Sequence, residues 1–113
     1  MNRHKNSNII DEIQDKIKEN CADKNLSLNF LAHMMDKSPA YIGRLFKEKT
    51  NRSVSEYILF VRMEKLRDLL DTTTQPANVL LEQVGLEKNN YFYTLFKKHF
   101  GVPLSSYKQK NME

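Results

Sequence analysis

Apolar residues recur at intervals of three and four along almost the whole chain of 113 residues, which is the spacing of amphipathic helices. The stripe is clearest near the start, where it comprises Ile9, Ile10, Ile13 and Ile17. The same spacing predicts seven helices, at about residues 9–20, 28–35, 39–50, 54–71, 78–84, 89–99 and from 103 onward. We therefore predict an all-α fold.

Capping residues mark the predicted helix boundaries. Ser38 is a favoured N-cap, and Pro39 suits the first position of the helix that follows. Ser53 or Ser55 begins the long helix at 54–71, and Glu56 stands at the capping-box spacing from Ser53. Because this long helix is apolar nearly all round in its first half, we expect it to be covered on more than one side.

Part of the pattern occurs twice. Six residues of one 17-residue window recur fifty positions later: Tyr41, Leu45, Phe46, Lys47, Ser55 and Tyr57 match Tyr91, Leu95, Phe96, Lys97, Ser105 and Tyr107. The predicted helices that precede these windows also correspond, once one extra residue is allowed in the second turn. The repeat predicts two copies of a helix-turn-helix unit joined by the long apolar helix.

This repeat sets the expected domain organisation. We expect a flexible segment, a first helix-turn-helix subdomain, a linker helix, a second subdomain and a tail, at residues 1–6, 7–53, 54–71, 72–110 and 111–113.

Positive charge gathers on the second helix of each unit and on the segment after it. The chain holds 18 Lys and Arg against 14 Asp and Glu, a net charge of +4. Residues 38–53 carry four basic residues and one acidic residue, and residues 88–110 carry five lysines and no acidic residue. Residues 7–24 carry five acidic and three basic residues. A charged run is usually only a solvated face, but duplication at equivalent positions suits a polyanion with a periodic groove.

Several classes of function are excluded by the residue types present. The single Cys21 cannot form an internal disulfide or a cysteine-based zinc site, which favours a reducing compartment. The three histidines are scattered without carboxylates at metal-ligand spacing, and no glycine-rich phosphate loop occurs. No apolar run approaches the ~18 residues of a membrane span. We therefore expect no enzyme, no cofactor and no membrane contact, and a location in the cytoplasm with the nucleoid.

The candidate base-reading residues lie on the second helix of each unit. In the first, Arg44 can grip guanine O6 and N7 with its fork, although a phosphate contact or a surface ion pair is the plainer alternative. In the second, Asn89 and Asn90 can pair with adenine, and one of the two is expected to be only the N-cap. The other outward positions expected to read bases are Pro39, Ala40, Gly43, Tyr93 and Thr94.

Gly43 and the two repeated tyrosines need separate explanations. A glycine within a helix costs about 1 kcal/mol relative to alanine, so Gly43 is explained if the helix backbone must approach a groove closely; tolerated drift is the alternative. We expect Tyr41 and Tyr91 to be partly buried scaffold residues rather than stacking platforms.

A second group of residues is suited to holding the phosphate backbone. Serines at helix starts place hydroxyl and N–H groups where phosphates bind, and lysine or arginine supplies charge. The expected backbone contacts are Ser38, Lys47, Lys49, Arg52, Ser53, Ser55, Lys88, Lys97, Lys98 and Ser105.

These residues also carry a family resemblance. The run LSLNFLAHMMDKSPAYIGRLFKEKTNRSVSEYILFVRMEKLRDLL resembles the first half of the AraC/XylS-type transcription-regulator DNA-binding domain. The run QVGLEKNNYFYTLFKKHFGVPLSSYKQK is similar to that family's signature region. The resemblance covers about residues 7–110. The chain departs from the family's usual small residue or proline at Leu66, Leu81 and Leu104, where we expect altered packing of the second unit.

The resemblance implies a bacterial transcription regulator whose recognition helices, about 39–50 and 89–99, enter adjacent segments of the major groove of double-stranded DNA. The joining helix would be ~27 Å long, which suits reading helices about one DNA turn (~34 Å) apart. The resemblance also implies a longer chain, with a sensor or receiver domain absent from this sequence, and a freestanding small regulator is the alternative. RNA polymerase is a further candidate partner. The alternative is a helical interaction module whose basic faces bind an acidic protein.

Overall fold

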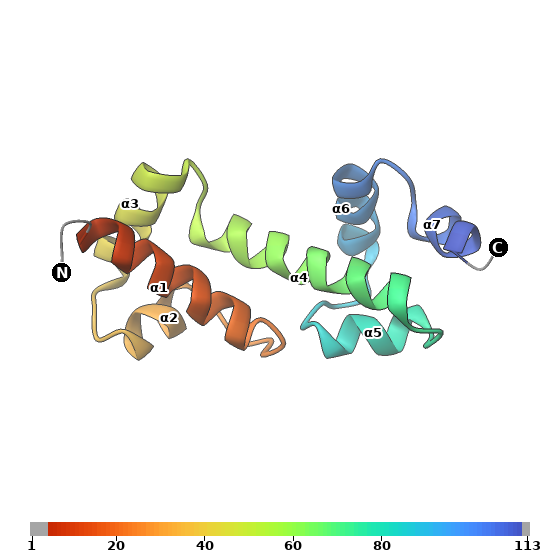
Figure 1. The fold of residues 1–113 in the computed structure, drawn as a ribbon, viewed down its shortest axis with the longest axis horizontal. Coiled ribbons are helices and arrows are strands. Elements are labelled where there is room, and N and C mark those ends of the chain that lie inside the picture. The colour runs from red at the N-terminus through yellow and green to blue at the C-terminus, as the bar shows by residue number, and fades with distance from the viewer. Residues whose placement is uncertain (1–4, 112–113) are drawn as a thin grey trace. The chain divides into compact units, whose positions relative to one another are not determined.

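The computed structural model describes residues 5–111, and all of the regular structure within them is helical (Figure 1). The helices are α1 (Lys5–Asn20), α2 (Leu28–Met34), α3 (Pro39–Thr50), α4 (Val54–Thr72), α5 (Ala77–Gln83), α6 (Asn90–Phe100) and α7 (Leu104–Asn111). The all-α prediction is confirmed. Of the expected terminal segments, residues 1–4 and 112–113 lie outside the described part of the chain, whereas Lys5 and Asn6 belong to α1 and Asn111 belongs to α7.

The chain divides into two compact units, residues 1–61 and 62–113. The division falls inside α4, the helix expected to be a linker, so this helix contributes residues to both units. Its first half supplies Val54, Tyr57, Ile58 and Val61 to the first core, and its second half supplies Met63, Leu66 and Leu70 to the second unit.

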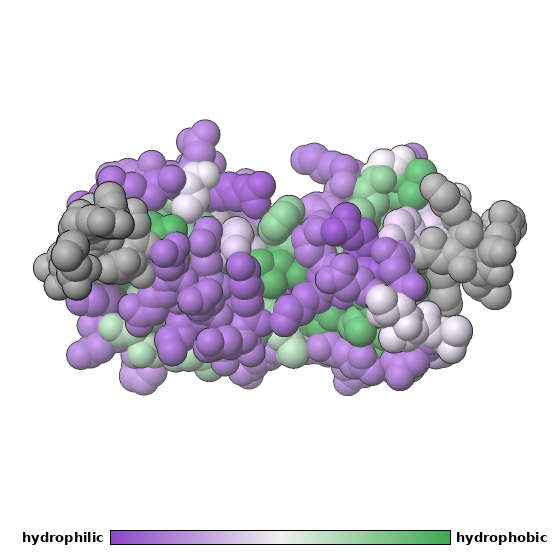
Figure 2. Space-filling model, viewed as in Figure 1, coloured by the Kyte–Doolittle hydropathy of each residue, from purple (hydrophilic) through white to green (hydrophobic). Residues whose placement is uncertain are grey.

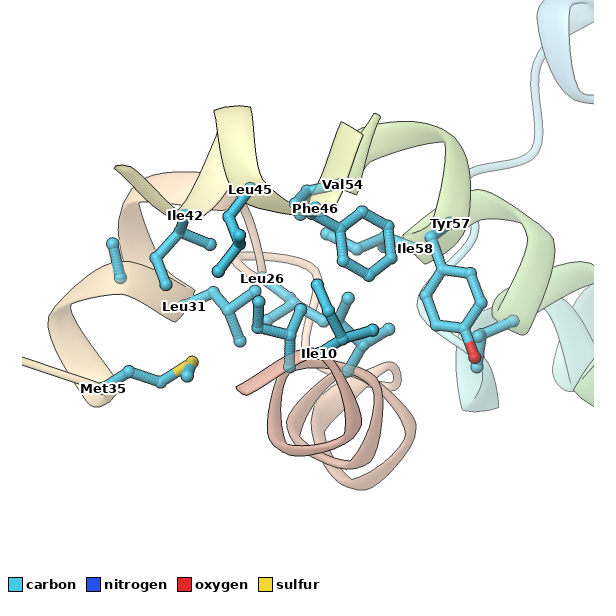
Figure 3. Packing of buried hydrophobic residues seen from close by; sticks show 14 of the residues in the cluster. Ile10, Leu26, Leu31, Met35, Ile42, Leu45, Phe46, Val54, Tyr57 and Ile58 are labelled. Atoms are coloured by element: carbon cyan, nitrogen blue, oxygen red, sulfur yellow. The ribbon is translucent and has the colours of Figure 1, made fainter. Parts of the chain in front are cut away.

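The core of the first unit is built from α1, α2, α3 and the first half of α4 (Figure 3). Its fully buried side chains include Ile13, Ile17, Leu31, Ile42 and Phe46. The Phe46 ring lies 5.5 Å from the Tyr57 ring of α4, in a tilted arrangement. Burial of each such large apolar side chain contributes about 1.5–3 kcal/mol. The helical stripe around Ile13 and Ile17 therefore fixes which face of α1 packs inward.

The second unit repeats this plan with the second half of α4 in the place of α1. Its buried side chains from α4 to α7 are Met63, Leu66, Leu70, Leu80, Leu81, Val84, Leu86, Phe92, Phe96 and Leu104. Leu66 is fully buried, and Leu81 and Leu104 are nearly so. The larger side chains at these three positions are therefore core residues of this unit.

The internal repeat is visible in the backbone. In the first unit Lys37 N donates to Ala32 O at 3.0 Å, and in the second Leu86 N donates to Leu81 O at 3.0 Å. The residue before each donor, Asp36 or Gly85, has a left-handed backbone. The ring pair Phe46–Tyr57 also has its counterpart in Phe96–Tyr107, with centroids 5.7 Å apart. The predicted duplication is confirmed.

The two helix-turn-helix turns differ in length. Residues 35–38 join α2 to α3, whereas residues 84–89 join α5 to α6. The sequence alignment needed an extra residue in this second turn, and the longer connection accommodates it.

Candidate nucleic-acid interface

The N-terminus of α3 presents an exposed, capped first turn. Ser38 Oγ accepts a hydrogen bond from Tyr41 N at 3.1 Å, so Ser38 is the predicted N-cap. Pro39 takes the first helical position, where its missing N–H is not needed. The buried face of α3 is formed by Ile42, Leu45 and Phe46. Pro39, Ala40 and Arg44 are exposed on the remaining surface, as the sequence predicts.

Gly43 does not face outward as expected. A Cβ built on Gly43 would lie 3.2 Å from Cδ2 of Leu28, a side chain of α2. The glycine therefore permits a close approach of α3 to α2 within the first unit. This packing accounts for a glycine in mid-helix without any approach to a groove.

At the start of α6, the structure separates the roles of the two asparagines. Asn89 is the N-cap, because its Oδ1 accepts from Phe92 N at 2.8 Å. Asn90 is the first helical residue and is exposed. Thr94 Oγ1 donates to Asn90 O at 3.1 Å, and the Tyr93 ring packs edge-on against Phe92 at 5.2 Å. Asn90, Tyr93 and Thr94 are exposed on α6. Of the two asparagines, Asn89 uses its oxygen for the cap, whereas the amide of Asn90 is exposed.

Tyr91 contradicts the expectation of burial. Tyr41 packs against the core of the first unit, whereas Tyr91 is 67% exposed. The two tyrosines are fifty residues apart, but their N-caps, Ser38 and Asn89, are fifty-one apart. Tyr91 therefore lies one residue nearer the start of its helix than Tyr41. Both side chains still point the same way from the helix axis, because the buried residues of the two helices, Ile42 with Phe46 and Phe92 with Phe96, are also fifty apart. Because the repeat predicts similar burial at the two positions, the sequence carries no signal for this difference.

The expected backbone contacts of the first unit gather at the start of α4. Ser53 and Glu56 form a capping box: Ser53 N donates to Glu56 Oε1 at 2.9 Å, and Glu56 N donates to Ser53 Oγ at 3.0 Å. Lys47 Nζ lies 4.0 Å from Glu56 Oε1, and the Arg52 guanidinium lies 4.6 Å from the centre of the Phe60 ring. These contacts hold two cations beside the capping box.

The electrostatic environment of Glu56 is favourable to its ionised form. Its pKa is lowered below the ordinary value by the hydrogen bond from the Ser53 backbone, then by the Ser53 side chain, and further by the charges of Lys47 and Arg52. Ser55 and Lys49 complete the expected contacts of this unit, and both are exposed.

In the second unit the expected backbone contacts are likewise at the surface. Lys88 precedes α6, Lys97 and Lys98 lie in its last turn, and Ser105 lies in the first turn of α7. All four residues are exposed. Hydrophilic residues also cover most of the face of each unit that Figure 2 shows.

One cluster was not predicted from the sequence. His99 Nε2 lies 2.9 Å from Glu64 Oε2, and the other oxygen of Glu64 is paired with Arg67. The Arg67 guanidinium is 5.9 Å from the centre of the Phe100 ring. Since Glu64 and His99 are thirty-five residues apart, no helical spacing could reveal their contact. The cluster holds the C-terminal end of α6 against α4.

The described residues offer neither a metal site nor a membrane span. No group of three or more His, Cys, Asp or Glu side chains among them is arranged to hold a metal ion. None of the helices described is both long enough and apolar enough to cross a bilayer.

Comparison with known proteins identifies relatives over nearly the whole chain. A family model described as a helix-turn-helix domain matches residues 31–110. The transcriptional regulatory protein YesN of Bacillus subtilis is 30% identical over 107 residues, which are 92% of this chain and 29% of YesN. The multiple antibiotic resistance protein MarA of Escherichia coli is 29% identical over 105 residues, or 93% of this chain and 79% of MarA.

The fold is also shared with a solved structure. The C-terminal domain of AraT, a response regulator from Geobacillus stearothermophilus, superposes with a TM-score of 0.83 and 30% identity. The match covers 90% of this chain and 84% of that domain. The chain thus spans under a third of YesN but most of the AraT domain and of MarA.

Proposed function

The chain belongs to the AraC-type helix-turn-helix family of DNA-binding transcription regulators, and from this premise we propose that α3 and α6 are its two recognition helices. Each enters a segment of the major groove of double-stranded DNA, and the two segments are adjacent. The observation that carries the proposal is the duplicated geometry: each helix is the second of a helix-turn-helix unit, begins with a side-chain cap and carries lysines in its last turn.

Sequence is read by side chains on the exposed outer faces of these helices. Arg44 offers two parallel donors to guanine O6 and N7. Asn90 offers an adjacent donor and acceptor to adenine N6 and N7. Asn89 is not assigned this role, because its oxygen already serves the cap of α6. Pro39, Ala40, Tyr93 and Thr94 shape the surface around these two readers.

The phosphate backbone is held by the basic and hydroxyl residues around each recognition helix. Lys47, Lys49 and Arg52 serve the first unit, and Lys88, Lys97 and Lys98 serve the second. Ser38 and Ser53 accept backbone hydrogen bonds through Oγ, which leaves each hydroxyl hydrogen to donate to a phosphate oxygen. Ser55 and Ser105 are exposed in first turns, where N–H groups favour anions. Such contacts fix orientation, and base contacts then supply specificity.

The wider role follows from the relatives. We place the chain in the bacterial cytoplasm, as the DNA-binding part of a larger regulator that also contacts RNA polymerase. YesN is much longer than this chain, and AraT is a response regulator whose matching part is its C-terminal domain. MarA, of which the chain covers 79%, supports the alternative of a small freestanding regulator. The proposed role requires no catalytic step, metal or cofactor.

Selection of bound sequences from a library of randomised duplex DNA tests the proposal. We expect enrichment of one asymmetric site with two clusters of preferred base pairs, because the two recognition helices carry different readers. An acidic protein added as competitor should not displace the selected duplex. Recovery of no preferred sequence, together with displacement by the acidic competitor, would show that the basic faces bind a protein partner instead.

A further inference from the structure

The exposed surface of α6 differs chemically from that of α3, although the two helices belong to repeated units. Fifty residues after Arg44, the equivalent position on α6 is Thr94. Fifty residues after Gly43, it is Tyr93, which is 40% exposed. With Tyr91 at 67% exposure, two aromatic rings stand on the surface of one recognition helix. Residues 40–44 of α3, Ala40 to Arg44, carry no exposed ring at the equivalent positions.

The positions of these side chains follow from helical geometry. Successive residues of a helix are about 100° apart around its axis. Asn90 and Thr94 therefore lie opposite the buried Phe92, at the centre of the exposed face. Tyr91 and Tyr93 lie on the two flanks, one on each side of this centre.

The polar groups at the centre are few. The Asn89 oxygen is used by the N-cap, and the Thr94 hydroxyl donates its hydrogen to Asn90 O. Asn90 is the one side chain of residues 90–94 that offers a donor and an acceptor side by side. No residue from 89 to 94 is charged. The exposed surface of residues 90–94 thus combines a single amide with two aromatic rings.

On the premise of the DNA reading proposed above, we infer that α6 recognises a half-site rich in A·T pairs. The Asn90 amide pairs with adenine N6 and N7, and the rings of Tyr91 and Tyr93 contact the C5 methyl groups of thymines to either side. Thymine is the base that presents a methyl group in the major groove, and adenine is the base that matches an asparagine amide. Arg44 gives α3 the opposite preference, for guanine. The two units therefore read chemically different half-sites.

Replacement of thymine by uracil tests this inference, because it removes only the C5 methyl. The probe is the duplex selected from the randomised library, with each thymine replaced in turn by deoxyuridine. Each contacted thymine should contribute about fourfold in affinity, the value of burying one methyl-sized group. Tyr91→Ala should abolish the loss caused by uracil at the thymine that Tyr91 contacts, and Tyr93→Ala should do the same at the thymine that Tyr93 contacts. Tyr91→Phe and Tyr93→Phe keep the ring, so both losses should persist in them.

Matched controls separate this inference from the proposed function. Val79 is 40% exposed but lies on α5, so Val79→Ala should show the same uracil losses as the wild-type chain. Circular dichroism of each variant checks the fold. If the duplex is bound but no thymine replacement weakens binding, or if the losses are unchanged in both tyrosine-to-alanine variants, the inference about α6 is wrong and DNA binding stands. If no duplex is selected at all, the proposed function itself fails.

Discussion

At equivalent backbone positions with positive φ, the two units use different residues. At the turn before each recognition helix the chain needs a left-handed residue, and the units use Asp36 with φ 57° and Gly85 with φ 81°. At the end of each recognition helix they use Asn51 with φ 63° and Gly101 with φ 82°. Asp and Asn tolerate this region better than other side chains, yet glycine adopts it without steric cost.

The first prediction concerns the strain at Asp36. We expect Asp36→Gly to stabilise the first unit by about 0.5–1 kcal/mol, since relief of the left-handed strain exceeds the added entropy of the unfolded chain. Gly101→Ala is the matched opposite change, because a Cβ there meets nothing within 4 Å and only the backbone angle opposes it. It should destabilise the second unit by about 1–2 kcal/mol. Urea unfolding of both variants measures the two effects, and a loss of stability in Asp36→Gly would contradict the strain argument.

The second prediction separates a base reader from a backbone contact. Arg44→Ala should weaken binding to the selected duplex by about 1–3 kcal/mol and relax selectivity at one base pair. Lys97→Ala should weaken selected and random duplexes by similar amounts, because phosphates are alike in all sequences. Fluorescence anisotropy with both duplexes measures the difference. If Arg44→Ala weakens binding to the selected and the random duplex equally, Arg44 contacts only phosphate.

At the scale of elements, the capping residues determine where helices begin. Ser27, Ser38, Ser53 and Asn89 each accept a hydrogen bond from the backbone N–H three residues later. Replacement of such a cap by alanine costs about 1 kcal/mol. These contacts are local in sequence, which is why the boundaries of α3 and α4 could be predicted to within a residue.

The third prediction concerns the capping box of α4. The pKa of Glu56 is lower in the folded chain than its ordinary value of 4.5. Ionised Glu56 therefore stabilises the fold at pH values above 4.5. This contribution is lost as the pH falls through the lower pKa of the folded state. Glu56→Gln keeps a capping side chain but cannot titrate. The gap in unfolding midpoint between the wild-type chain and Glu56→Gln should therefore narrow from neutral pH to acid, and a gap that is constant with pH would show that the charge of Glu56 has no effect.

Contacts between elements were less predictable than the elements themselves. Gly43 faces Leu28 because α3 approaches α2 closely there, and no pattern within α3 reveals this approach. The exposure of Tyr91 depends on which side chains pack beside it, since Tyr41 at the equivalent position packs against the core of the first unit. The contact of His99 with Glu64 joins residues from separate helices. The sequence thus indicated which helices carry the candidate site, whereas packing decided which of their side chains are exposed.

At the scale of the whole molecule, the distribution of charge gives DNA binding a strong dependence on salt. If about five of the proposed basic contacts neutralise phosphates, the logarithm of affinity should fall with the logarithm of salt concentration at a slope near −4 to −5. Removing one contact, as in Lys97→Ala, should reduce the slope by about 1. Titrations across a series of salt concentrations measure both values. A slope close to zero would exclude the proposed role of the lysines.

The central claim is that one chain reads DNA with two different recognition helices. A scan of single base-pair changes across the selected duplex, measured with the wild-type chain, Arg44→Ala and Asn90→Ala, tests it most directly. We predict two clusters of sensitive base pairs: Arg44→Ala loses discrimination in one cluster alone, and Asn90→Ala loses it in the other alone. If both variants lose discrimination in the same cluster, or if Asn90→Ala retains the full wild-type pattern, the claim that α3 and α6 each read their own bases is contradicted.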